Sequence, residues 1–243
     1  MKADVLIVGS GVAGLDCALN LPKEKSIIVV TKNKARRSDS YLAQGGICVL
    51  RDEDDYDSFY EDTMKAGHYE NNPDSVHIMI HSSQDVIADL VSFGVRFEKN
   101  GDEFVYTREG AHSHQRILFH EDETGKEITS HLLETARARE NITIIENYTM
   151  VDLICDGNEC HGIIGHDENG VYTAIQADYT VLATGGIGGI FEHGVVRLNG
   201  SVNAVFIVSD DAVTFVSITD EVNHRVVFND SNVLSRSCGF EQM

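Results

Sequence analysis

The chain has 243 residues, of which 42% are hydrophobic and 24% charged, a composition typical of a globular protein that buries a sizeable core. Its formal net charge of -20 at pH 7 argues against nucleic-acid binding, because that function needs a surface that neutralises phosphates. The five cysteines form no Cys-x-x-Cys pair, which predicts neither a disulfide framework nor a zinc site. We expect no metal site, no signal peptide, no membrane association and a cytoplasmic protein.

The N-terminus carries the pattern of a dinucleotide-binding βαβ unit. A strand expected over residues 4–8 leads into Gly9-Ser10-Gly11-Val12-Ala13-Gly14, and a second apolar strand follows at 27–30. In this spacing the first glycine permits a tight turn, the second lets backbone approach a pyrophosphate, and the third lets the helix pack closely on the strand. The phosphates then lie at a helix N-terminus, where free N–H groups favour negative charge.

A basic cluster follows the second strand and comprises Lys32, Lys34, Arg36 and Arg37. Lys32 stands where a nucleotide-binding unit normally reads the adenosine ribose with an acidic residue, so Thr31-Lys32 departs from the plain fingerprint. For the other three cations the sequence leaves a solvated loop and a functional loop equally open.

Further elements are expected in chain order. Asn72-Pro73 predicts a capped helix start, and Gly94 predicts its end. A hairpin turn is expected at Asn100-Gly101, a helix over 127–139 and a strand over 142–145. Three short strands are expected between Met150 and Val181, with turns at 156–158 and 168–170, and the last leads to Ala183-Thr184-Gly185-Gly186. The loop 107–116 has no regular period and concentrates ionisable groups, which makes it a candidate for chemistry.

The predicted fold is therefore α/β. Residues 1–193 are expected to form a Rossmann-like domain with a parallel sheet and a three-stranded β-meander. Residues 194–243 are expected to form a separate β-rich tail of unknown role, with turn signals at 199–200, 209–211 and 229–231.

Taken together, these segments resemble the flavoprotein family of succinate dehydrogenases, fumarate reductases and L-aspartate oxidases, over about residues 2–193. The resemblance rests on the glycine motif, the Ala43-Gln44-Gly45-Gly46 loop, the meander and the Ala183-Thr184-Gly185-Gly186 strand. Within that family the chain is most similar to L-aspartate oxidases, through Thr107-Arg108-Glu109-Gly110-Ala111-His112-Ser113-His114 followed by Arg116-Ile117-Leu118.

The resemblance implies FAD as the cofactor. Non-covalent binding is implied because Ser40-Tyr41-Leu42 offers no histidine where the respiratory members attach their flavin. The implied FAD-binding residues are Gly9, Ser10, Gly11, Val12, Ala13 and Gly14 at the pyrophosphate, Lys32 at the adenosine end, Ser40, Gln44, Gly45 and Gly46 near the flavin and ribityl chain, Met150 and Val151 at the adenine, and Ala183, Thr184 and Gly185 where the last strand approaches the nucleotide.

The resemblance also implies a reaction. Glu109 matches the family's active-site glutamate and would meet the amino group of L-aspartate, which is oxidised to iminoaspartate with oxygen or fumarate as electron acceptor. That product feeds quinolinate and NAD synthesis, which makes quinolinate synthase a candidate partner. His112 and His114 are open to two interpretations, substrate orientation or hydrogen bonding within the loop. Arg108 and Arg116 are expected to pair with local acids such as Glu121 and Asp122 rather than with a substrate carboxylate.

The resemblance ends after His193, before the capping domain that supplies further substrate-binding residues in the family. We therefore expect weak or no activity from this chain by itself. Two alternatives stay open beside an aspartate oxidase: a non-catalytic FAD-binding domain whose tail serves another partner, and a fumarate reductase-like flavoprotein acting on another acid.

Overall fold

The computed structural model describes residues 1–186, 203–209, 212–218 and 228–229. Its centre is a parallel array in the order β11-β1-β2-β8. These strands are β11 (Tyr172–Leu182), β1 (Lys2–Val8), β2 (Ile27–Thr31) and β8 (Ile142–Glu146). The βαβ unit predicted from the glycine motif is confirmed, with α1 (Val12–Asn20) between β1 and β2.

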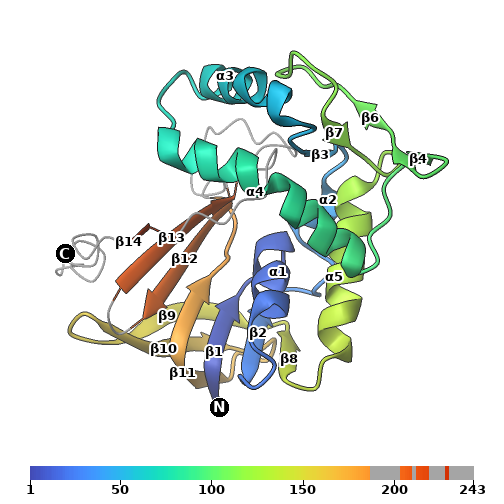
Figure 1. Cartoon of the computed structure of the whole chain (residues 1–243). Helices are drawn as coiled ribbons and strands as arrows, with labels where there is room; N and C mark the ends of the chain where they lie inside the picture. Colours follow the sequence, from blue (N-terminus) through green and yellow to red (C-terminus); the bar gives the residue numbers. More distant parts are fainter. Residues whose placement is uncertain (187–202, 210–211, 219–227, 230–243) are drawn as a thin grey trace.

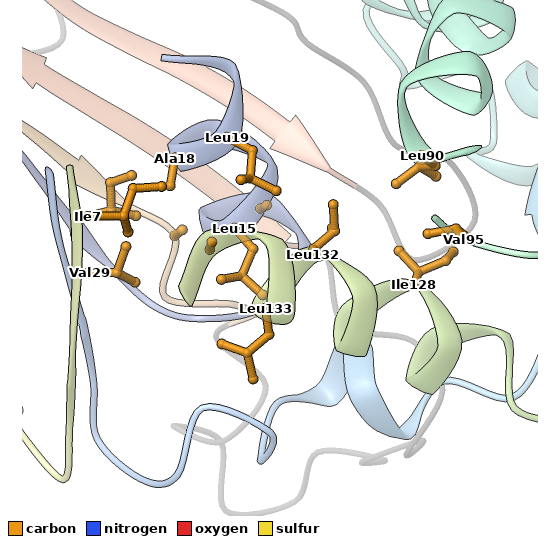
Figure 2. Close-up of a cluster of buried hydrophobic side chains, with 14 of the residues drawn as sticks. Ile7, Leu15, Ala18, Leu19, Val29, Leu90, Val95, Ile128, Leu132 and Leu133 are labelled. Carbon is orange, nitrogen blue, oxygen red and sulfur yellow. The ribbon is translucent and has the colours of Figure 1, made fainter. Parts of the chain in front are cut away.

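The central strands β1 and β2 are buried on both faces, which explains their continuous apolar sequences. On β1, Val5 and Ile7 belong to one cluster of buried side chains, whereas Leu6 and Val8 belong to another on the opposite face. Figure 2 shows the first cluster, in which Ala18 of α1 lies beside Ile7, and to which α5 (Thr124–Ala138) contributes Leu132 and Leu133. The second face is covered by residues of the β-meander.

Helix α5 begins three residues earlier than the periodicity predicts. The expected start at Glu127 rested on the apolar face of Ile128, Leu132 and Ala136, all of which are buried as expected. The additional turn contains Gly125, which donates a backbone hydrogen bond to the Ala43 carbonyl. A Cβ at this glycine would collide with the Ser40 and Ala43 carbonyl oxygens. Contact with the 40–43 segment therefore sets this helix start. Hydrophobic periodicity does not predict the additional turn, because the turn depends on a contact with a segment distant in the sequence.

The β-meander consists of β9 (Thr149–Asp156), β10 (Glu159–His166) and the first part of β11, with turns at the expected places. Its third strand and the strand that leads to Ala183 are one continuous strand. Opposite β1, β11 pairs with β10 over residues 172–176 and with a further strand, β12 (Asn203–Ser209), over residues 179–182.

Strand β12 pairs antiparallel with β13 (Ala212–Ile218), which pairs with β14 (Phe228–Asn229), so these strands extend the central sheet beyond β11 (Figure 1). The turn signal at 199–200 and the boundary at residue 193 lie outside the described residues. The same holds for residues 210–211 of the expected turn at 209–211 and for residues 230–231 of the expected turn at 229–231. The division of the chain into two domains stays a prediction.

A second region carries helices on the side toward which β1 and β11 run (Figure 1). Its longer elements are α3 (Tyr56–Ala66) and α4 (Pro73–Ser92), and its short ones are α2 (Asp39–Leu42), the 3-10 turn η1 (Glu53–Asp55), the hairpin β4 (Lys99–Asn100) and β5 (Glu103–Phe104), and a small sheet of β3 (Ile47–Cys48), β7 (Ile117–Leu118) and β6 (Tyr106–Thr107). The predicted start of α4 is confirmed, because the Asn72 side chain accepts hydrogen bonds from the N–H groups of Asp74 and Ser75. Among the described helices, none has the length and apolar character needed to cross a membrane.

Candidate functional site

A cavity of about 340 Å³ lies at the carboxyl ends of the parallel strands. This is the edge where open α/β sheets bind nucleotides. Five separate segments form its wall: the glycine turn before α1, the end of β2, the start of α2, the start of β9 and the segment after β11. The lining residues are Val8, Gly9, Ser10, Gly11, Ala13, Val30, Thr31, Lys32, Arg37, Ser38, Asp39, Ser40, Tyr148, Thr149, Met150, Ala183, Thr184 and Gly185.

The glycine turn has the geometry that a pyrophosphate site needs. Gly9 adopts φ +117°, and a Cβ there would collide with the Ala183 carbonyl oxygen. A Cβ on Gly14 would collide with the carbonyl oxygen of Gly9, so the third glycine permits close packing of α1 against the turn. Gly11 is the N-cap of α1 and lies on the cavity wall, and as a glycine it places no side chain over the start of this helix. Bare backbone at a helix N-terminus therefore faces the cavity, as a dinucleotide requires.

The segment 35–40 is tied to the glycine turn by two side-chain hydrogen bonds, and a third caps α2 within the segment. Ser10 Oγ donates to the Ala35 carbonyl oxygen at 3.2 Å, and the Val12 N–H donates to Ser40 Oγ at 3.2 Å. Ser38 caps α2 by accepting a hydrogen bond from the Tyr41 N–H at 3.2 Å. These bonds hold Ser38 and Ser40 beside Gly11 on the wall of the cavity.

The opposite wall is fixed by backbone pairing at the ends of strands. The Ala183 N–H donates to the Val8 carbonyl oxygen at 2.8 Å, and the Tyr148 N–H donates to the Thr31 carbonyl oxygen at 3.0 Å. Tyr148 is buried, and its hydroxyl donates to the Thr173 carbonyl oxygen at 2.7 Å. Sequence reasoning missed Tyr148 and Thr149, although their position immediately before Met150 was the available signal.

The structure brings ten of the sequence-predicted cofactor residues together on this cavity: Gly9, Ser10, Gly11, Ala13, Lys32, Ser40, Met150, Ala183, Thr184 and Gly185. Six do not line it: Val12, Gly14, Gln44, Gly45, Gly46 and Val151. Val12 and Gly14 support the turn as described above, whereas the Val151 side chain is 54% exposed on β9. Contacts of these six with a cofactor stay predictions.

Gly45 and Glu109 meet at a second place. A Cβ on Gly45 would lie 3.1 Å from Oε1 of Glu109 and 3.3 Å from Oε2, so the carboxylate lies directly against the Ala-Gln-Gly-Gly loop. Gln44 donates from Nε2 to Asp122 Oδ2 at 3.3 Å. Gly46 packs against β7, where a Cβ would collide with Ile117 and with the Leu118 carbonyl oxygen. The candidate catalytic carboxylate is exposed, and it lies beside the loop expected to approach the flavin.

Arg116 anchors the loop that carries Glu109. Its side chain is fully buried, and its guanidinium donates to Asp55, to Ser58 Oγ at 2.7 Å and to Asp62 Oδ2 at 2.7 Å. Asp62 also accepts hydrogen bonds from the N–H and Oγ of Ser113, both at 2.7 Å. Arg116 pairs with acids as predicted, but the prediction that those acids are Glu121 and Asp122 is wrong. The true partners lie on η1 and α3, more than fifty residues away in sequence.

This network changes the pKa of both carboxyl groups. Burial of Asp55 acts to raise its pKa, but hydrogen bonds from Arg116 and Ser58 outweigh it and lower the pKa below 3.8. Asp62 behaves in the same way, because hydrogen bonds from Ser113 and Arg116 outweigh its desolvation. Both groups are therefore held as carboxylates.

The two histidines of the loop are hydrogen-bonded within the protein. His112 Nδ1 lies 3.1 Å from Nη1 of Arg116, which can only donate, so the neutral imidazole carries its proton on Nε2. That nitrogen lies 3.2 Å from Cys48 Sγ. The His114 side chain is exposed, and its Nδ1 lies 3.2 Å from Oδ1 of the buried Asp55. These contacts favour the structural interpretation for both residues. In the described part of the chain, no cluster of three or more His, Cys, Asp or Glu residues is arranged to hold a metal ion.

Comparisons with known proteins match the same part of the chain. The model of the FAD binding domain family matches residues 4–220, which extends past His193, where the resemblance was expected to end. The chain is 49% identical over 190 residues to an L-aspartate oxidase of Clostridium perfringens, covering 78% of this chain and 43% of the relative. It is 44% identical over 194 residues to an L-aspartate oxidase of Clostridium acetobutylicum, covering 79% of this chain and 44% of the relative. The chain thus spans less than half the length of these relatives.

Solved structures agree with the fold. An E. coli quinol fumarate reductase superposes with a TM-score of 0.75 at 25% identity, over 79% of this chain and 34% of that chain. Because the family model covers the strands, the glycine turn and the cavity wall alike, we conclude that the chain belongs to the FAD binding domain family and that its cofactor is FAD.

Proposed function

We propose that these residues form the FAD-binding part of an L-aspartate oxidase, which oxidises L-aspartate to iminoaspartate in the cytoplasm. The observation that carries the proposal is the contact between Glu109 and Gly45, which joins the candidate carboxylate to the loop expected beside the flavin. The names of the two clostridial relatives support the choice of substrate. Oxygen or fumarate is the proposed electron acceptor, FAD is held without a covalent bond, and quinolinate synthase is the proposed downstream partner.

The cofactor, when bound, accepts the two electrons removed from the substrate carbon. The protein's own part is to hold the amino acid and move its proton. An ionised Glu109 attracts the substrate ammonium group and accepts a proton from it, which must happen before electrons leave the carbon. The rigid Arg116 network fixes the loop from which Glu109 projects, so that the carboxylate keeps its place against Gly45.

The proposal predicts a change in the visible spectrum of the purified, FAD-loaded chain. Anaerobic L-aspartate should bleach the flavin absorption, while D-aspartate should leave it unchanged. Because the chain covers 43% of the Clostridium perfringens relative, the same measurement on this chain joined to the remaining part of that relative is the companion experiment. A fast bleach by succinate with none by L-aspartate would contradict the proposal and favour a fumarate reductase-like enzyme.

A non-catalytic FAD-binding domain is the second candidate. The exposure of Glu109 favours it, because nothing in the described residues covers the carboxylate from water. Retention of FAD without any bleaching by L-aspartate, in both the chain and the joined protein, would support this candidate.

A further inference from the structure

The basic cluster after β2 separates into two kinds of cation. Lys34 Nζ lies 3.2 Å from Glu146 Oε2, and Arg36 Nη2 lies 2.9 Å from Glu134 Oε1. These two are neutralised by acids on α5 and β8. Lys32 and Arg37 differ, because neither side chain has an ion pair or hydrogen bond with any part of the chain that the structure describes.

The two unpaired cations both line the cavity, whereas Lys34 and Arg36 do not. The cavity wall carries one carboxylate, that of Asp39, so its formal charge is positive within a chain of net charge -20. A positive cavity in such an acidic protein calls for an anionic ligand. The N-terminus of α1 at Gly11 contributes positive potential to the same space.

We propose that Arg37 is a phosphate-binding residue of the cavity and, with Lys32, selects ligands that carry a nucleoside diphosphate. The inference rests on the proposed FAD site and adds a residue to it. Arg37 lies one residue before Ser38, the cap of α2, and its own N–H donates to the Lys34 carbonyl oxygen at 2.8 Å. The backbone of Arg37 is therefore held in a turn, and its side chain is free to meet a phosphate on the cavity side.

An arginine is suited to this role because its planar guanidinium binds two phosphate oxygens at once. The neighbouring Arg36 is the matched control. It carries the same charge and immediately precedes Arg37, but its guanidinium is paired with Glu134. The experiment is a calorimetric titration of the wild type, Arg37→Gln, Arg37→Lys and Arg36→Gln with FAD, with ADP and with adenosine. Thermal unfolding of each variant checks that the fold is intact.

We expect Arg37→Gln to weaken FAD and ADP binding by about tenfold, the usual size of a charge-assisted hydrogen bond. Arg37→Lys should recover part of this loss, and Arg36→Gln should change little. Adenosine binding should be insensitive to Arg37, and the dependence of ADP affinity on salt should become shallower in Arg37→Gln only, because one phosphate contact is lost.

Equal affinities of Arg37→Gln and Arg36→Gln for ADP would overturn the inference while leaving the FAD site intact. An equal loss for adenosine and ADP would also overturn it, because Arg37 would then contact the base or ribose. Failure of the wild type to bind FAD or ADP would instead contradict the proposed function, so the two failures are distinguishable.

Discussion

The Arg116 guanidinium donates two hydrogen bonds to Asp55, from Nε to Oδ2 at 3.0 Å and from Nη2 to Oδ1 at 2.7 Å. This bidentate pair is buried, because Arg116 is 0% and the Asp55 side chain 5% exposed. It joins the end of the loop that carries Glu109 to η1 and α3. The pair therefore links the helical region to the loop that carries the candidate catalytic carboxylate.

Replacing Arg116 should strongly destabilise the protein. Arg116→Leu leaves the buried Asp55 and the partly buried Asp62 without their cation, and breaking a buried pair such as Arg116–Asp55 costs about 3–5 kcal/mol. Arg108→Leu is the control, because Arg108 is exposed and its guanidinium has only a long contact of 3.5 Å to the Ser113 carbonyl oxygen. Urea unfolding measures both. A loss for Arg116→Leu no larger than that for Arg108→Leu would contradict the structural role of the pair.

The same carboxylates predict how stability depends on pH. Their pKa values are lower in the folded chain than the ordinary value of 3.8, so the folded state binds fewer protons than the unfolded state in that range. Their contribution is complete above the unfolded pKa and is lost as the pH falls through the folded pKa. The free energy of unfolding should thus decrease below about pH 4. Asp62→Asn should make this acid dependence shallower, and an unchanged slope would contradict the assignment.

Glu109→Gln should separate flavin binding from chemistry. The amide has nearly the same shape but cannot attract an ammonium group or accept its proton. We expect unchanged FAD affinity and slower flavin reduction by L-aspartate, by about 10²–10⁴-fold. Anaerobic stopped flow on the chain joined to the rest of the Clostridium perfringens relative measures the rate. Glu121→Gln is the control for the loss of a negative charge, because Glu121 is an exposed carboxylate outside both sites. Equal rates for wild type and Glu109→Gln would remove Glu109 from the mechanism.

Local signals in the sequence predicted the parts of the fold that depend on neighbouring residues. The Asn72-Pro73 helix start, the Gly94 helix end and the glycine turn all follow from backbone chemistry within a few positions. The FAD cavity was predictable for the same reason, since the glycine motif determines which end of the sheet binds the nucleotide.

The rest depends on contacts between distant residues. The partners of Arg116 lie on η1 and α3, so the nearby acids Glu121 and Asp122 were a reasonable but wrong expectation. The sorting of Arg36 from Arg37 depends on Glu134 of α5, which approaches only in the folded chain. Periodicity and composition contain no information on such pairings.

The central claim is that the cavity behind the glycine turn binds FAD, and Gly11→Val tests it most directly. Gly11 lies on the cavity wall with its backbone exposed to the ligand space, and a Cβ there would already lie 3.1 Å from Ser40 Oγ. The valine branches would occupy the pyrophosphate position.

Gly110→Val is the matched control, because a Cβ at Gly110 meets nothing within 4 Å. The measurement is a fluorescence-quenching titration of both folded variants and the wild type with FAD, with NAD as a second ligand. We predict FAD binding by the wild type and Gly110→Val, no FAD binding by Gly11→Val, and no substitution of NAD for FAD. Equal FAD affinity of the wild type and a folded Gly11→Val would contradict the account.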